Sequence, residues 1–164
     1  MLNIIVAIDE NNAIGRQGEL LCHLPADLQH FKAITTGHTV LMGERTWLSL
    51  PHRPLPHRRN IVLTDRVGET FDGAITVYDL QEALRLANEE EEAFVIGGGM
   101  VYRQCIAWAY RLYITHIHHI WHDADTFFPE ILPSCWSEVK REEFAADDNN
   151  PYDFSFVTYE RKKA

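Results

Sequence analysis

One acidic side chain is placed where it could hold a ligand by hydrogen bonds. Asp27 lies in a helical pattern over residues 26–34, on the same face as Leu24 and Phe31, because residues three and four apart share a helix face. Apolar surroundings raise the pKa of a carboxyl group and suit it to hydrogen-bond a protonated heterocycle. The same acid could instead complement the dipole of the helix N-terminus, which Pro25 marks. These residues alone leave both interpretations open.

A run of three glycines could bind a phosphate group. A buried strand pattern at residues 93–96 ends at Gly97, and a helical pattern follows the third glycine directly. Exposed amides at a helix N-terminus and missing side chains let a pyrophosphate approach the backbone closely. The run is not the Rossmann fingerprint, because Tyr102 stands where the last glycine would be. A tight turn between strand and helix explains the glycines equally well.

A second junction of this kind begins at Gly43. A strand pattern at residues 39–42 precedes this glycine, and a helical pattern that opens with the hydroxyl of Thr46 follows it. Two such junctions in one sheet could hold the two ends of a dinucleotide, in the crevice at the carboxyl ends of the strands. The pair predicts dinucleotide binding more strongly than either junction alone.

The elements that must position these residues alternate along the chain. Strand patterns recur at residues 4–8, 39–42, 60–63, 74–77, 93–96, 111–118, 136–140 and 154–159. Helical patterns lie at residues 26–34, 46–50, 80–88 and 101–108. No helical pattern separates the last two strands, so we expect an antiparallel hairpin through residues 146–151. The predicted fold is one α/β domain over residues 1–164, with a mostly parallel central sheet, helices on both faces and a C-terminal antiparallel hairpin.

Composition limits the classes of function. The 164 residues, 46% of them hydrophobic, suffice for one domain with a core. A net charge of −9 argues against nucleic-acid binding, although the basic cluster at residues 52–59 could bind a small anion. Neither a membrane-length apolar run nor a leader pattern is present, so we expect a cytoplasmic protein with no membrane partner. The three cysteines form no CxxC pair, which argues against disulfides and a zinc ribbon.

In their order and separation, these segments resemble the dihydrofolate reductase family of bacterial chromosomal type. The similarity extends over nearly the whole chain. It is carried by Ile5-Val6-Ala7, Ala13-Ile14-Gly15, Leu24-Pro25-Ala26-Asp27-Leu28, Phe31-Lys32, Met42-Gly43, Thr46-Trp47, Arg53-Pro54-Leu55-Pro56, Arg58-Arg59-Asn60-Ile61, Ile96-Gly97-Gly98-Gly99, Val101-Tyr102, Thr115-His116 and Asp125-Thr126-Phe127-Phe128-Pro129.

This resemblance implies reduction of dihydrofolate to tetrahydrofolate by hydride transfer from NADPH, in support of one-carbon metabolism. Asp27 would hold the pterin ring, and Thr115 would join the same hydrogen-bond network. Arg58 would bind the α-carboxylate of the glutamate tail, since a planar guanidinium suits a carboxylate. Antifolate inhibitors would bind the same site. The other substrate contacts would come from Ile5, Val6, Leu28, Phe31, Leu50, Leu55 and Ile96.

The resemblance also implies a cofactor site at the two glycine junctions. Residues 11–22 would form the loop that closes over nicotinamide, and a cis peptide would join Gly97 and Gly98. The family needs no metal and is usually monomeric. The cofactor contacts would be Ala7, Ile14, Gly43, Glu44, Arg45, Thr46, Leu63, Thr64, Asp65, Gly98, Gly99, Met100, Val101 and Tyr102.

Three positions near the predicted pterin and lid depart from the family pattern. Cys22 stands where a tryptophan is usual, and Leu21 where a proline is common. The missing indole leaves that corner roomier or wetter, which bears on proton delivery; a reactive thiol there is the less favoured interpretation. Ala124 occupies a position that is often glycine, in a loop expected to support lid closure.

Two acids depart from the family pattern on the cofactor side. Glu44 and Asp65 stand where basic or hydroxylated residues usually surround the 2′-phosphate of NADPH. An acid suits a ribose 2′-hydroxyl better, so we expect NADPH use with a weakened preference over NADH. The neighbouring Arg45 and Arg66 could take over the phosphate, and the sequence leaves this open.

Three other assignments compete with this one. A pyrimidine reductase of riboflavin synthesis has a similar fold and also uses nicotinamide, but Asp27 and Arg58 argue against it. A non-catalytic folate- or nucleotide-binding protein would lack the acid or the glycines, and both are present. His116 and His118 share one strand face and could chelate a metal, yet no carboxylate or cysteine is obviously placed to complete the shell.

Overall fold

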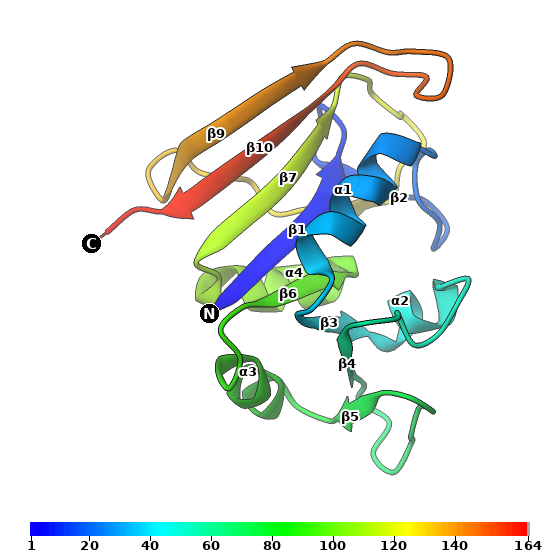
Figure 1. The fold of residues 1–164 in the computed structure, drawn as a ribbon, viewed down its shortest axis with the longest axis vertical. Helices are drawn as coiled ribbons and strands as arrows, with labels where there is room; N and C mark the ends of the chain where they lie inside the picture. Colours follow the sequence, from blue (N-terminus) through cyan, green and yellow to red (C-terminus); the bar gives the residue numbers. More distant parts are fainter. Residues whose placement is uncertain (164) are drawn as a thin grey trace.

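Both glycine junctions follow strands of one sheet (Figure 1). The structure is a computed structural model that describes residues 1–163. Within these residues eight strands form the sheet, in the order β5-β4-β3-β6-β1-β7-β10-β9. Their bounds are β1 Leu2–Ile8, β3 Thr39–Gly43, β4 Arg59–Leu63, β5 Ile75–Val77, β6 Ala93–Gly97, β7 Arg111–Ile117, β9 Trp136–Phe144 and β10 Phe154–Arg161.

The sheet is mostly parallel, as the alternation of strands and helices predicts. Neighbouring strands from β5 to β7 run parallel to one another, so their carboxyl ends meet at one edge. β10 pairs antiparallel with both β7 and β9, which forms the predicted C-terminal hairpin. β1 lies between β6 and β7, at the centre of the sheet. The strands before both glycine junctions, β3 and β6, are direct neighbours.

Helices cover both faces of the sheet, also as predicted. Ile4 of β1 shares a core cluster with side chains of α3 and α4, whereas Ala7 packs with Leu24 and Ala26 at the start of α1. Because successive strand residues point to opposite faces, α1 lies on the face opposite α3 and α4 (Figure 1). The helices of the described residues are α1 Pro25–Thr35, α2 Glu44–Ser49, α3 Leu80–Asn88, α4 Gly99–Cys105 and the short 3-10 helix η1 Ile106–Trp108.

The structure differs from the predicted elements where apolar periodicity is weak. The short strands β2 (Ala13–Gly15) and β8 (Thr126–Phe127) pair antiparallel in a second small sheet, which no sequence pattern indicated. β9 continues to Phe144, four residues beyond the predicted strand, because charged residues of an exposed edge strand leave no apolar alternation to read. The helical pattern at 101–108 is divided between α4 and η1.

The cysteines and the helices bear on the redox state and on membrane insertion. All three cysteines are free thiols, as their spacing predicted. Within residues 1–163, the helices lack the length and apolar character that a membrane crossing requires.

Candidate active site

The way in which α1 begins determines the position of Asp27. Pro25 occupies the first turn, where its missing N–H costs nothing. The backbone N–H of Ala26 donates to Oδ1 of Asn150 at 3.1 Å, so the loop between β9 and β10 fixes the start of the helix. Asn150 is buried, and sequence reasoning did not select it because it lies 124 residues away. This anchor sets where the first turn, and with it Asp27, meets the sheet.

The carboxyl group of Asp27 meets the hydroxyl of Thr115 at the sheet surface. Thr115 lies near the end of β7, pairs with Ala7 of β1 and is 2% exposed. Its Oγ1 donates to Oδ1 of Asp27 at 2.5 Å. Burial raises the pKa of Asp27, and the Thr115 hydrogen bond offsets part of this rise. An acid that served only the helix dipole would remain in water, so the geometry favours the ligand-binding interpretation.

The raised pKa predicts how Asp27 affects stability. The folded chain binds this proton more tightly than the unfolded chain, so stability falls as the pH rises through the raised pKa. Asp27→Asn removes the desolvated charge and should raise the free energy of unfolding on the order of 1 kcal/mol at about pH 8, and much less at about pH 4. Denaturant titrations at the two pH values measure this. A loss of stability at the higher pH would contradict it, and the exposed Asp65→Asn serves as the control.

Arg58 is braced by the loop that carries it. Its Nη1 donates to Oγ1 of Thr35 at 3.1 Å, and its guanidinium lies 5.8 Å from the centre of the Phe31 ring. The side chain of Asn60 accepts from the N–H of Leu55 and donates to the carbonyls of Leu55 and Arg58, each at 3.0 Å. Asn60 therefore fixes the turn that presents the guanidinium. Asn60 was assigned no role from the sequence, although it lies in the segment Arg58-Arg59-Asn60-Ile61 that carries the family resemblance.

Most residues predicted to contact the substrate lie on the α1 side of the sheet. Ile5 is buried, Phe31 is half-buried, and Leu28 is 49% exposed on α1. Leu50, Leu55 and Ile96 pack around the cluster formed by Val40, Met42, Trp47 and Val62. Val6 differs, because its side chain packs into the core cluster on the α3 and α4 side. A contact between Val6 and a ligand on the α1 side would have to come from its backbone.

The two glycine junctions meet at the ends of β3 and β6. A Cβ built on Gly97 would lie 2.9 Å from Oγ1 of Thr46, and Gly97 has a φ of +144°. A Cβ on Gly99 would lie 2.7 Å from Cγ2 of Thr126. The peptide between Gly97 and Gly98 is cis, as the resemblance predicted. Backbone atoms alone fit here, which suits the close approach of a pyrophosphate.

The other predicted cofactor residues divide into surface and core. Tyr102 is buried beneath the junctions, and its hydroxyl donates to the carbonyl of Ile5 at 2.9 Å. Met100 is 66% exposed on the first turn of α4, and the Cδ1 of Ile14 lies 3.7 Å from the position of a Gly99 Cβ. Leu63 and Val101 pack into the main core cluster, so their side chains support the junctions from behind. Gly43 and Thr64 are buried, Ala7 is half-buried, and Arg45 and Asp65 are exposed.

Two acids hold the first part of the segment predicted to close over nicotinamide. Asp9 accepts from the N–H groups of Asn11 and Ala13, both at 2.8 Å, and from that of Trp121 at 3.0 Å. Oδ2 of Asp125 accepts from the N–H of Gln17 at 2.7 Å. Sequence reasoning assigned neither acid a role. Together they hold residues 11–17 against the loop that precedes β8.

Cys22 has the character of a neutral thiol. Burial, followed by the nearby charge of Asp27, raises its pKa to about 11. A thiolate is the nucleophilic form, so this environment suppresses reactivity and favours the less reactive interpretation of Cys22.

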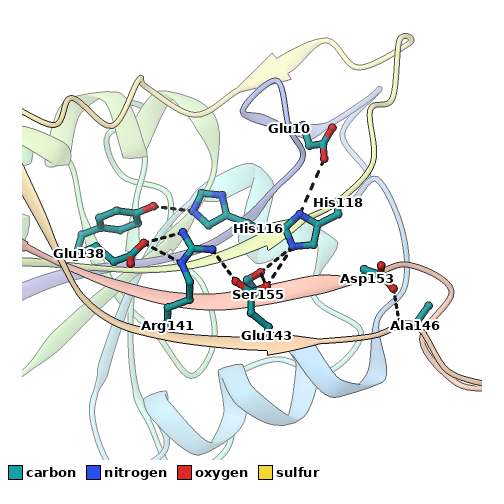
Figure 2. A network of polar contacts seen from close by, with 10 residues as sticks. Glu10, His116, His118, Glu138, Arg141, Glu143, Ala146, Asp153 and Ser155 are labelled. Carbon is teal, nitrogen blue, oxygen red and sulfur yellow. Dashed lines mark hydrogen bonds and ion pairs between the residues drawn. The ribbon is translucent and has the colours of Figure 1, made fainter.

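His116 of β7 and His118, which follows the end of this strand, take part in polar contacts with the C-terminal hairpin (Figure 2). Nε2 of His116 lies 2.8 Å from the hydroxyl of Tyr159, and Nε2 of His118 lies 2.7 Å from Oγ of Ser155. Glu10 and Glu143 approach His118 at 4.0 and 3.7 Å, two carboxylates that the sequence pattern did not anticipate. Even so, the described residues contain no group of three or more His, Cys, Asp or Glu side chains able to hold a metal ion.

Known proteins are similar to this chain over nearly its whole length. The family model for dihydrofolate reductase matches residues 1–161. The chain is 43% identical to a dihydrofolate reductase of Bacillus subtilis, over 100% of this chain and 96% of that protein. It is 42% identical to a type 3 dihydrofolate reductase of Salmonella typhimurium, over 99% of both.

A solved structure extends the similarity to three dimensions. Dihydrofolate reductase from Enterococcus faecalis, complexed with NADP(H) and the compound named RAB-propyl, superposes with a TM-score of 0.92 at 36% identity, covering 99% of this chain and 97% of that one. Sequence and fold agree over the full length, and the chain belongs to the dihydrofolate reductase family.

Proposed function

We propose that this chain reduces 7,8-dihydrofolate to 5,6,7,8-tetrahydrofolate with NADPH as the hydride donor. Family membership supports the reaction, and the E. faecalis relative was solved with NADP(H). The observation that carries the proposal is the partly buried pair of Asp27 on α1 and Thr115 on β7. β7 belongs to the same sheet as β3 and β6, the strands that end at the glycine junctions, and only β1 separates it from β6. The product would supply one-carbon metabolism and, through it, thymidylate and purine synthesis.

The residues of this chain bind, orient and shield the reactants. Asp27 accepts hydrogen bonds from the pyrimidine-like edge of the pterin, and Thr115 keeps the carboxyl group aligned. When bound, the nicotinamide of NADPH supplies a hydride to C6 of the pterin. A proton reaches N5 from solvent on the side polarised by Asp27. The lid that Asp9 and Asp125 anchor limits the entry of further water.

A direct assay tests this function. We expect NADPH oxidation, followed by its absorbance, only when dihydrofolate is added. A riboflavin-type pyrimidine reductase would oxidise NADPH with its own pyrimidine substrate and ignore dihydrofolate. A non-catalytic folate- or nucleotide-binding protein would bind without turnover. Either result would overturn the proposal.

Arg58→Gln should raise the KM for dihydrofolate about 30- to 300-fold with a much smaller change in kcat, because the lost ion pair contributes mainly to substrate binding. Steady-state kinetics at saturating NADPH measure the effect. The matched control is Arg59→Gln, since Arg59 pairs with Glu90 at 2.9 Å instead of facing Phe31 and Thr35. A dihydropterin that lacks the glutamate tail should be reduced equally well by the Arg58 variant and the wild type. Equal losses for both substrates would refute the assigned role.

We also propose a monomer in the cytoplasm that binds antifolates at the substrate site. Three free cysteines suit a reducing compartment. The outer strand β9 carries charged residues that discourage pairing with a second sheet. Those charges are Glu138, Lys140, Arg141, Glu142 and Glu143. The E. faecalis relative, solved with a second compound beside NADP(H), supports small-molecule binding by this fold.

A further inference from the structure

We infer that Glu44 sets the cofactor preference of this enzyme by holding the Arg66 guanidinium that would otherwise bind the 2′-phosphate of NADPH. The inference rests on the proposed function for the presence of a dinucleotide. It adds a specific device, an internal carboxylate that competes with the ligand for one arginine. The sequence left open whether Arg45 or Arg66 compensates for the acids, and the contacts distinguish between them.

The topology brings Glu44 and Arg66 together. β3 and β4 are parallel neighbours, and Gly43 pairs with Leu63 at their carboxyl ends. The chain continues from these paired residues into Glu44 on one side and into Thr64 and Arg66 on the other. Both segments therefore leave the sheet at the edge where parallel α/β sheets bind dinucleotides.

At this edge, one carboxylate oxygen of Glu44 accepts hydrogen bonds from both Arg66 and Thr64. Its Oε1 accepts from Nη2 of Arg66 at 2.7 Å, from Nε of Arg66 at 2.9 Å and from Oγ1 of Thr64 at 3.1 Å. Glu69 approaches the remaining nitrogen, Nη1 of Arg66, at 3.6 Å. Acids thus approach all three nitrogens of the guanidinium. An incoming phosphate must compete with them for the same donors.

The charges of Glu44 and Arg66 affect the affinities for NADPH and NADH differently. The hydrogen bonds from Arg66 hold the pKa of Glu44 below its usual range, so the carboxylate stays ionised. A 2′-phosphate that captured Arg66 would leave this carboxylate without its cation and beside a second anion. A ribose 2′-hydroxyl can donate to Glu44 without disturbing the pair, as acids do at NAD sites. The Glu44–Arg66 pair therefore disfavours NADPH relative to NADH.

Arg45 acts elsewhere despite its position beside Glu44. The N–H of Gln17 and the hydroxyl of Thr126 lower the pKa of Asp125, and the charge of Arg45 contributes a further, smaller part. The charge of Arg45 thus acts on Asp125, whereas Glu44 binds Arg66 and Thr64. The Arg45 charge should not distinguish a 2′-phosphate from a 2′-hydroxyl.

Fluorescence titrations of the substrate-free enzyme with NADPH and NADH test the inference. Glu44→Gln should raise the affinity for NADPH relative to NADH about tenfold, because it removes the competing charge and keeps the shape. Arg66→Gln should lower NADPH affinity about fivefold or more and leave NADH affinity nearly unchanged. In the double variant the gain from Glu44→Gln should disappear. An unchanged ratio of affinities in Arg66→Gln, or an equal gain for both dinucleotides in Glu44→Gln, would overturn the inference.

Matched controls separate this inference from the proposed function. Arg45→Gln removes a neighbouring positive charge and should weaken both dinucleotides equally. The fragments 2′,5′-ADP and 5′-ADP carry the adenosine end alone, so their affinities need no turnover and no nicotinamide. The ratio of their affinities should change across the variants in the same way as the ratio for NADPH and NADH. If the ratio for the fragments did not change, Glu44 would not set the cofactor preference. If the fragments follow the pattern while dihydrofolate is not reduced, the proposed function alone fails.

Discussion

Asp27→Asn should slow hydride transfer to dihydrofolate by about 10²- to 10³-fold near neutral pH, the range typical of a lost acid–base group. The amide keeps the size of the side chain and can still accept from Thr115, whose Oγ1 lies 2.5 Å from the carboxylate in the wild type. It cannot carry the negative charge that favours a protonated pterin. Single-turnover kinetics with saturating NADPH isolate this step from product release.

The pH profile of this variant identifies the cause of the defect. The deficit should shrink as the pH falls, because solvent then protonates N5 without help from the carboxylate. The variant should also bind NADPH normally and unfold no more easily than the wild type, since burial of the charged form raises the pKa of Asp27. Near-wild-type turnover at neutral pH would show that Asp27 is only a structural residue of α1.

Gly97→Ala should weaken NADPH binding at least about 100-fold and lower the free energy of unfolding by about 2–4 kcal/mol, from backbone strain combined with overpacking. A φ of +144° is a conformation that L-residues rarely adopt, and the new Cβ would lie 2.9 Å from Oγ1 of Thr46. Relief would require Thr46 to move at the second junction, so both glycine junctions would be disturbed. NADPH titration and denaturant unfolding measure the two effects.

Gly37→Ala is the matched control for this change. Gly37 also has a positive φ, +86°, but nothing lies within 4 Å of its Cβ position. It follows α1 and precedes β3, away from the ends of the strands that carry the junctions. This variant should lose about 1–2 kcal/mol from strain alone and bind NADPH normally. Equal losses of NADPH affinity in the two variants would show that the junction does not depend on close packing at Gly97.

The features predicted correctly from the sequence are those that local physics encodes. Alternating apolar strands and helices specify a parallel sheet covered on both faces, and glycines at strand ends mark the places where backbones crowd. The position of Asp27 on the apolar face followed from helical spacing. Each of these signals lies within about ten residues of chain, the range over which periodicity can be read.

Two of the residues that sequence reasoning missed act on distant backbone groups. Asn150 binds the N–H of Ala26 across 124 residues, and Asp125 binds that of Gln17 across 108. Such a polar side chain in a loop has no periodic neighbours that would mark its partner. The same limit applied to Glu44, whose charge was noticed while its capture of Arg66 was not, because that contact depends on the pairing of β3 with β4.

Hydride transfer from NADPH to the pterin held by Asp27 is the step on which the proposed function depends. NADPH labelled with deuterium on the transferred position of the nicotinamide tests it most directly, with the product analysed by mass spectrometry and NMR. We expect tetrahydrofolate that carries one deuterium at C6, formed mole for mole with NADP⁺ and almost absent with Asp27→Asn at neutral pH. Unlabelled product, or label transfer that Asp27→Asn leaves undiminished, would contradict it.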